Sequence, residues 1–264
     1  MDIKRATDIT VLAHTLVLIG LSASGMAGGV LSEIIYISAF LLPTVLGVLL
    51  GKRSGAALPT MKIKRDDLST MLLSVFPTVL VVLLISLLTS YVLSFTDAVN
   101  DVTVYETFWE NVLRHALIPA VIEEAAFRYL PFMLFGENKR ECIIVSTLSF
   151  AFIHCSLFQI PYALAAGFIF MLVNLMTDSP IPSFVIHLVN NTVSVISIFY
   201  KTDLPIIITL GILTLICAVF IFKERKSYIE RIKAIFVAKS KLKLSYSLLI
   251  IIIPTAFVAI LNLL

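Results

Sequence analysis

The chain has 264 residues, of which 59% are hydrophobic and only 14% are charged, and its formal net charge is +3. A soluble globular domain has about 25% charged residues, and the mean hydropathy of +1.02 lies far outside that class. These values exclude a soluble enzyme, and the small net charge gives no reason to expect a nucleic-acid partner.

Apolar segments long enough to cross a bilayer, about 17–25 residues each, recur along nearly the whole chain. The sequence therefore predicts an all-α, polytopic membrane protein with about eight to nine transmembrane helices and a core bundle from spans four to seven. Residues 1–264 are expected to form a single integral-membrane domain, with a catalytic core at about 110–200. The predicted spans are 9–27, 30–50, 71–95, 110–136, 141–158, 160–177, 180–200, 204–222 and 245–264.

The placement of lysine and arginine fits nine alternating spans with the N-terminus in the cytoplasm. In that arrangement seventeen of the twenty basic residues lie inside, Lys201 lies outside, and Arg114 and Arg128 fall within a span. The dense use of Ile, Leu and Lys favours a bacterial plasma-membrane protein. The basic segment 223–244 is either an amphipathic helix on the inner leaflet or a loop that only sets the orientation.

The fourth span contains Glu123, Glu124 and Arg128. Each charge costs about 2.5–10 kcal/mol in hydrocarbon, so such groups indicate a functional site by default. Glu124 and Arg128 are four residues apart on one helix face and are expected to form a supporting ion pair. Glu123 points about 100° away and is left without a counter-ion, which suits a general acid or base. The alternative is a purely structural ion-pair cluster.

Two further spans carry polar residues at helical spacing. Phe150 and His154 would share one helix face, and so would His187 and Asn191, which can point into one cavity. Each histidine taken separately is more often an interhelical hydrogen-bonding group. Taken with Glu123, however, the polar residues form a cluster from three spans.

The cluster is compatible with two kinds of chemistry. Glu123, helped by His154, could take a proton from water, while His187 and Asn191 donate hydrogen bonds to the carbonyl oxygen that becomes negative. Alternatively, Glu123, His154 and His187 could ligate a zinc ion that keeps an open position for water. The residue pattern does not choose between them. The remaining histidines, His14 and His115, are expected to be structural.

The three motifs together resemble the signature of the CAAX protease and bacteriocin-processing (Abi) family of intramembrane endopeptidases, which includes the Ras-converting CAAX prenyl proteases. The order, the spacing within each motif and the polytopic context agree, over roughly residues 110–200. The motifs are Glu123-Glu124-x-x-x-Arg128, Phe150-x-x-x-His154 and His187-x-x-x-Asn191.

The resemblance implies an endopeptidase whose catalytic residues are Glu123, His154, His187 and Asn191. Members of the family are often labelled metalloproteases, and a glutamate-activated water is the competing mechanism. Bacterial members are associated with bacteriocin self-immunity and with maturation of peptides or membrane proteins. The expected partners are a peptide or membrane-protein substrate and membrane lipid. The alternative functions are a proton-coupled transporter and a non-catalytic self-immunity protein on the same fold.

Overall fold

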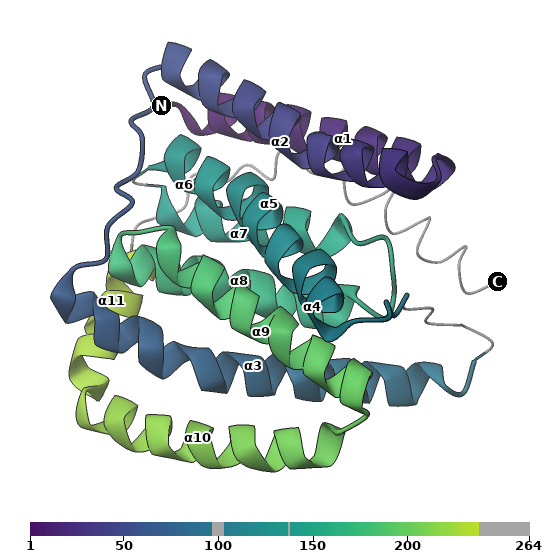
Figure 1. Ribbon diagram of the computed structural model, residues 1–264. Coiled ribbons are helices and arrows are strands. Elements are labelled where there is room, and N and C mark those ends of the chain that lie inside the picture. Colours follow the sequence, from purple (N-terminus) through teal and green to yellow (C-terminus); the bar gives the residue numbers. More distant parts are fainter. Residues whose placement is uncertain (97–102, 137, 238–264) are drawn as a thin grey trace.

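The computed structural model describes residues 1–96, 103–136 and 138–237, and helices account for most of them (Figure 1). Six of these helices, α1, α2, α3, α8, α9 and α10, are long and apolar enough to cross a membrane. The predicted all-α, polytopic fold is therefore confirmed. The described helices are α1 (Ile3–Met26), α2 (Gly29–Arg53), α3 (Arg65–Leu93), α4 (Phe108–Asn111), η1 (Val112–Leu117), α5 (Ile118–Glu124), η2 (Ala125–Tyr129), α6 (Leu130–Phe135), α7 (Lys139–Phe152), α8 (Ile160–Thr177), α9 (Ile181–Tyr200), α10 (Asp203–Lys223) and α11 (Arg225–Phe236), of which η1 and η2 are π-helical.

Helices α1 and α2 form a hairpin that covers one side of the bundle (Figure 1). The two helices approach closely at Gly20, where an added Cβ would overlap Ala39. Near the turn, Ser24 Oγ donates to the carbonyl of Ser32 at 2.8 Å, and Ser32 Oγ donates to the carbonyl of Ser24 at 2.9 Å. These reciprocal bonds join α1 to α2 beside the turn.

The predicted fourth span is one continuous helical segment over residues 108–135, interrupted by the π-helices η1 and η2. Within η2 the backbone N–H of Leu130 bonds to the carbonyl of Ala125, and Pro131 has no N–H to offer. The carbonyls of Ala126 and Phe127 are consequently free to accept from neighbouring helices. His14 of α1 and Ser146 of α7 bond to these two carbonyls, respectively.

The predicted span 141–158 is too long, because α7 ends at Phe152. Cys155, with a φ of 49°, is in the left-handed region and turns the chain. Pro161 then occupies the first turn of α8, a position where its missing N–H costs no hydrogen bond. His154 therefore lies in the connection between α7 and α8, not on a helix.

Part of the basic segment 223–244 is helical, as one of the two interpretations requires. Helix α11 covers residues 225–236, and its Arg231 forms an ion pair with Asp67 of α3. Arg231 also donates to the carbonyl of Met176 at 3.0 Å, so α11 is attached to α3 and α8. Residues 238–244 and the predicted ninth span, 245–264, lie outside the described residues.

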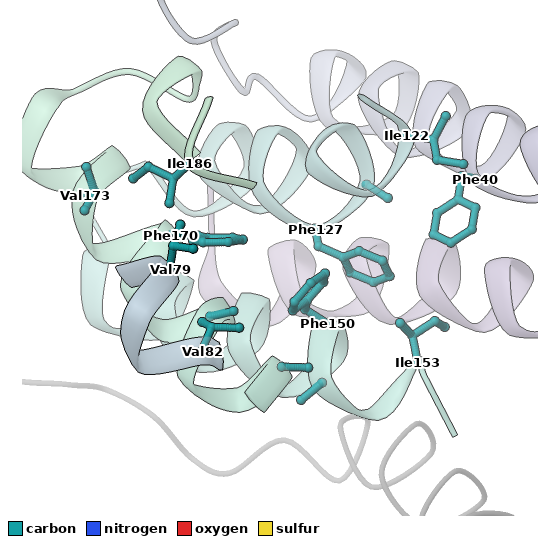
Figure 2. Packing of buried hydrophobic residues seen from close by; sticks show 14 of the residues in the cluster. Phe40, Val79, Val82, Ile122, Phe127, Phe150, Ile153, Phe170, Val173 and Ile186 are labelled. Atoms are coloured by element: carbon teal, nitrogen blue, oxygen red, sulfur yellow. The ribbon is translucent and has the colours of Figure 1, made fainter. Parts of the chain in front are cut away.

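The largest hydrophobic core joins the hairpin to the later helices, and Figure 2 shows part of it. Three buried phenylalanines from different helices run through this core. Phe150 lies between Phe127, at a ring-centroid distance of 5.8 Å, and Phe170, at 6.4 Å. The second motif thus contributes its phenylalanine to the packing that holds η2, α7 and α8 together.

The two ends of the bundle differ in charge. Among the described residues, every lysine and arginine except Arg114, Arg128 and Lys201 lies at one end, which we call the basic end. There the N-terminus, the α2–α3 loop, the C-terminal ends of α6 and α8, and α11 lie together (at the left of Figure 1). The α1–α2 turn, α4 and the C-terminal end of α9 lie at the opposite end.

Candidate active site

A cavity of about 580 Å³ lies among α2, α3, the segment 108–135, α8 and α9. Glu123, His154, His187 and Asn191 all line it, so the structure brings the four predicted catalytic side chains to one place. Glu124 and Arg128 do not line this cavity. The two adjacent glutamates therefore face different surroundings, as their helical spacing predicts.

Glu123 is not as isolated as the sequence predicts. The hydroxyl of Tyr36 donates to Glu123 Oε1 over 3.4 Å, a long hydrogen bond. On the other side, Nε2 of His187 lies 3.8 Å from Glu123 Oε2. The carboxylate is thus held between an α2 tyrosine and the third-motif histidine, and it keeps access to the cavity.

The predicted pair between Glu124 and Arg128 is present. Arg128 Nη1 lies 3.5 Å from Glu124 Oε1, and both side chains are buried. The guanidinium carbon of Arg128 lies 3.7 Å from the centroid of the Phe150 ring and 5.1 Å from that of Phe170. Aromatic faces attract a desolvated cation, so the charge of Arg128 is balanced by one carboxylate and two rings.

Glu124 has a second contact that its spacing to Arg128 does not predict. Nδ1 of His187 lies 2.8 Å from Glu124 Oε1. An ionised carboxylate can only accept a hydrogen bond, so Nδ1 carries the proton and donates. Glu124 therefore fixes the orientation of His187 in addition to pairing with Arg128.

His154 keeps its contact with Phe150 although it lies beyond the end of α7. Its Nδ1 is 2.7 Å from the carbonyl oxygen of Phe150, and the two rings meet edge to face at 5.0 Å. A carbonyl accepts, so Nδ1 is the protonated nitrogen. Nε2 then carries a lone pair and can accept a proton.

Asn191 is oriented by its neighbour. The amide of Asn190 donates to Asn191 Oδ1 at 3.2 Å. The carbonyl oxygen of Asn191 is thus already bonded, while its NH₂ group stays available as a donor. Asn190 lines the same cavity.

His14 and His115, which are expected to be structural, each contact a backbone carbonyl, and His115 also lines the cavity. Nε2 of His14 lies 3.1 Å from the Ala126 carbonyl in η2. Nε2 of His115 lies 2.8 Å from the carbonyl oxygen of Thr103. This contact attaches the chain before α4 to the helical segment 108–135.

The side of the cavity that faces the α1–α2 turn ends in a charged cluster. Arg114 forms ion pairs with Glu33 of α2 and with Glu110, one helical turn earlier. The Arg114 guanidinium also lies over the ring of Tyr105 at 4.7 Å. The three charged side chains are partly exposed, and Glu33 and Arg114 line this side of the cavity.

Sequence reasoning missed two contributors to this site. Tyr36 comes from α2, far from the motifs along the chain, and a tyrosine in an apolar span carries no distinguishing signal. Phe170 of α8 packs against the ring of His187 at 5.2 Å. Its position among other apolar residues of α8 predicts only a core role.

The zinc-binding prediction can be compared with the geometry. Among the described residues there is no group of three or more His, Cys, Asp or Glu side chains placed to hold one metal ion. Nδ1 of His187 and Nδ1 of His154 are bonded to protein groups, which leaves Nε2 of each ring as the nitrogen that could bind a metal. Zinc ligation by Glu123, His154 and His187 therefore stays a prediction.

A family model described as type II CAAX prenyl endopeptidase, Rce1-like, matches residues 105–193. No match was found among curated proteins or among solved structures. The matched region contains all three motifs and begins at Tyr105, close to the cavity entrance. The family match thus confirms the resemblance drawn from the motifs: residues 105–193 of this chain are similar to Rce1-like CAAX endopeptidases.

Proposed function

We propose that this protein is an intramembrane endopeptidase that hydrolyses a peptide bond with a water molecule activated by Glu123. One observation carries the proposal: Glu123, His154, His187 and Asn191, which come from three motifs, line a single cavity. Ionisable groups at membrane depth that face a cavity are costly to keep and mark functional sites.

The attacking water would lie between the Glu123 carboxylate and the unprotonated Nε2 of His154. Glu123 takes a proton from this water as its oxygen attacks the carbonyl carbon of the substrate, a step of general-base catalysis. When the carbon–nitrogen bond breaks, protonated Glu123 returns the proton to the leaving amine. The Tyr36 hydroxyl, 3.4 Å from Oε1, keeps the carboxylate facing the cavity during both steps.

The carbonyl oxygen becomes negative in the tetrahedral intermediate and needs hydrogen-bond donors. The free NH₂ group of Asn191 is one donor. His187 can be the second only when it is doubly protonated, because its Nδ1 proton is already donated to Glu124. Glu123 and Glu124 lie on either side of that ring and would balance the charge of an imidazolium. Glu124 is therefore a positioning residue for His187.

Substitution of the cavity residues tests this mechanism. An internally quenched fluorescent peptide library, incubated with the purified protein in detergent, reports cleavage without a known substrate. We expect Glu123→Gln and His154→Ala each to lower cleavage by at least about 100-fold, with no loss of folded protein. Glu230→Gln, on the exposed face of α11, is the control and should cleave normally. Full activity of Glu123→Gln would refute the assigned base.

The same variants separate the alternative functions. A Glu123→Ala protein that still protects cells from a bacteriocin would favour a non-catalytic self-immunity protein. Proton-coupled uptake in proteoliposomes without any peptide cleavage would favour a transporter.

Metal dependence is a separate question. Zinc held by Glu123, His154 and His187 would supply a polarised water, and elemental analysis of the purified protein tests for it. One equivalent of tightly held zinc, lost in a His154→Ala variant, would support a metalloprotease in place of the glutamate mechanism.

The proposed setting is a bacterial plasma membrane with the basic end in the cytoplasm, because positive charge is retained on that side. The proposed partners are a peptide or membrane-protein substrate and the surrounding lipid.

A further inference from the structure

We infer that the catalytic cavity opens on the non-cytoplasmic face of the membrane and that its substrate is a peptide segment presented from that face. That the cavity receives a substrate rests on the proposed function. The side of the membrane on which the cavity opens depends only on the structure.

The first observation is the position of the cavity along the bundle. Beyond the catalytic side chains, its lining continues toward the end opposite the basic end, and no lysine or arginine of the basic end lines it. The residues that line this outer part are Ser24 and Ser32 at the α1–α2 turn, Thr103 and Asn111 around α4, and Ser194 and Phe199 in α9. The cavity therefore leads away from the basic end.

The second observation is the charge at the entrance. The only described basic residues at this end are Arg114 and Lys201, and Arg114 is paired with Glu33 and Glu110. Basic residues near span ends are strongly biased toward the cytoplasm. The entrance carries two carboxylates and one paired arginine, so we place it on the non-cytoplasmic side of the membrane.

The third observation is a cluster of aromatic residues beside the entrance. The single tryptophan of the chain, Trp109, is 75% exposed, and Tyr200 at the end of α9 is 55% exposed. Phe108 packs against Tyr200 at 5.7 Å. Tryptophan and tyrosine concentrate where a membrane meets water, so this end of the bundle lies at an interface. The entrance next to it is open to the aqueous phase or to the headgroup layer.

These observations limit the substrate. A cytoplasmic peptide would meet the basic end, where no described residue of the α2–α3 loop or of α11 lines the cavity. A peptide that has crossed the membrane, or the external tail or loop of a membrane protein, meets Glu33, Arg114 and Thr103 directly. The proteolytic site is thus suited to chains that have already been exported.

Two matched cysteine substitutions test the orientation without any substrate. Thr103→Cys lies at the entrance, and Thr60→Cys lies in the exposed α2–α3 loop of the basic end. Neither change alters a charge. Spheroplasts of bacteria that express each variant are treated with a membrane-impermeant maleimide, before and after permeabilisation, with the parent chain as the background for the native cysteines.

We expect Thr103→Cys to be labelled to the same extent before and after permeabilisation, and Thr60→Cys to be labelled only afterwards. The reverse pattern, or equal labelling of both variants in sealed spheroplasts, would overturn the inference.

A second measurement examines the substrate side. The quenched peptide library, which does not cross membranes, is added to sealed right-side-out vesicles, to sealed inverted vesicles and to detergent extracts. Cleavage that depends on Glu123 is expected in right-side-out vesicles and in detergent, and not in inverted vesicles. Cleavage in detergent and in inverted vesicles alone would overturn the inference. Absence of cleavage even in detergent would contradict the proposed function, while the labelling result would still decide the orientation.

Discussion

Arg128 is the residue whose burial needs the most compensation. It is fully buried, and its partners are Glu124 at 3.5 Å and the rings of Phe150 and Phe170. Removing one partner of a buried ion pair costs about 3–5 kcal/mol, because the other charge is left uncompensated. We therefore expect Arg128→Met to lower the free energy of unfolding by roughly that amount.

The double variant tests whether the charge of Glu124 is the cause. Glu124→Gln combined with Arg128→Met removes both charges, so part of the lost stability should return. Unfolding curves in detergent provide the measurement, and Arg225→Met, at an exposed arginine of α11, is the control. If the double variant is no more stable than Arg128→Met alone, loss of the aromatic packing explains the effect instead.

Tyr36 is a second residue with a testable role. A neutral donor to a carboxylate contributes about 1 kcal/mol when the bond is long, which corresponds to about a fivefold change in rate. Tyr36→Phe should lower kcat for peptide cleavage by about that factor and lower the free energy of unfolding by no more than about 1 kcal/mol. Tyr91→Phe, on an exposed tyrosine of α3, provides the comparison. An unchanged kcat in Tyr36→Phe would mean that the hydroxyl does not position Glu123.

Among the elements, η2 depends most on its neighbours. Pro131 cannot bond to the carbonyl of Phe127, and Ser146 of α7 donates to that carbonyl instead. Ser146→Ala would leave a buried carbonyl unsatisfied, which costs about 1–3 kcal/mol. We expect a corresponding loss of thermal stability. Adding Pro131→Ala restores a backbone N–H at that turn and should recover part of it, and a double variant with no recovery would contradict this account.

The same element shows how far the sequence could predict the site. The spacing of Glu124 and Arg128 predicts their pairing. Residues four apart lie close together in a regular α-helix, and the two side chains also meet here, where Arg128 lies in the π-helix η2. The bond between Glu124 and His187 depends on how α9 packs against α5, and no local spacing contains that information. The end of α7 before His154 likewise depends on the left-handed turn at Cys155. The apolar sequence continues through this position and gives no sign that the helix ends.

On the scale of the whole molecule, hydropathy predicts the polytopic fold, since each span must satisfy its own backbone hydrogen bonds. It does not predict that the α1–α2 hairpin, outside the region of family similarity, brings His14 to η2 and Tyr36 to Glu123. That arrangement comes from packing between helices distant in sequence.

The packing of this hairpin leads to a prediction for the whole site. Gly20 leaves no room for a Cβ against Ala39, whereas a Cβ at Gly25 of the same helix meets nothing within 4 Å. Gly20→Val should separate α1 from α2 and lower both the melting temperature and peptide cleavage. Gly25→Val should alter neither by a comparable amount. Equal effects of the two changes would show that helix propensity, and not close packing, is responsible.

The shielding of Arg128 has a consequence for biosynthesis. Segment 108–135 leaves the ribosome with Glu123, Glu124 and Arg128 on it, but Phe150, Phe170 and His187 are translated only later. Until those helices emerge, the insertion machinery holds a segment whose charges oppose entry into lipid. We therefore expect stable insertion of this segment to wait for α7, α8 and α9, so that the catalytic core enters the bilayer as a group.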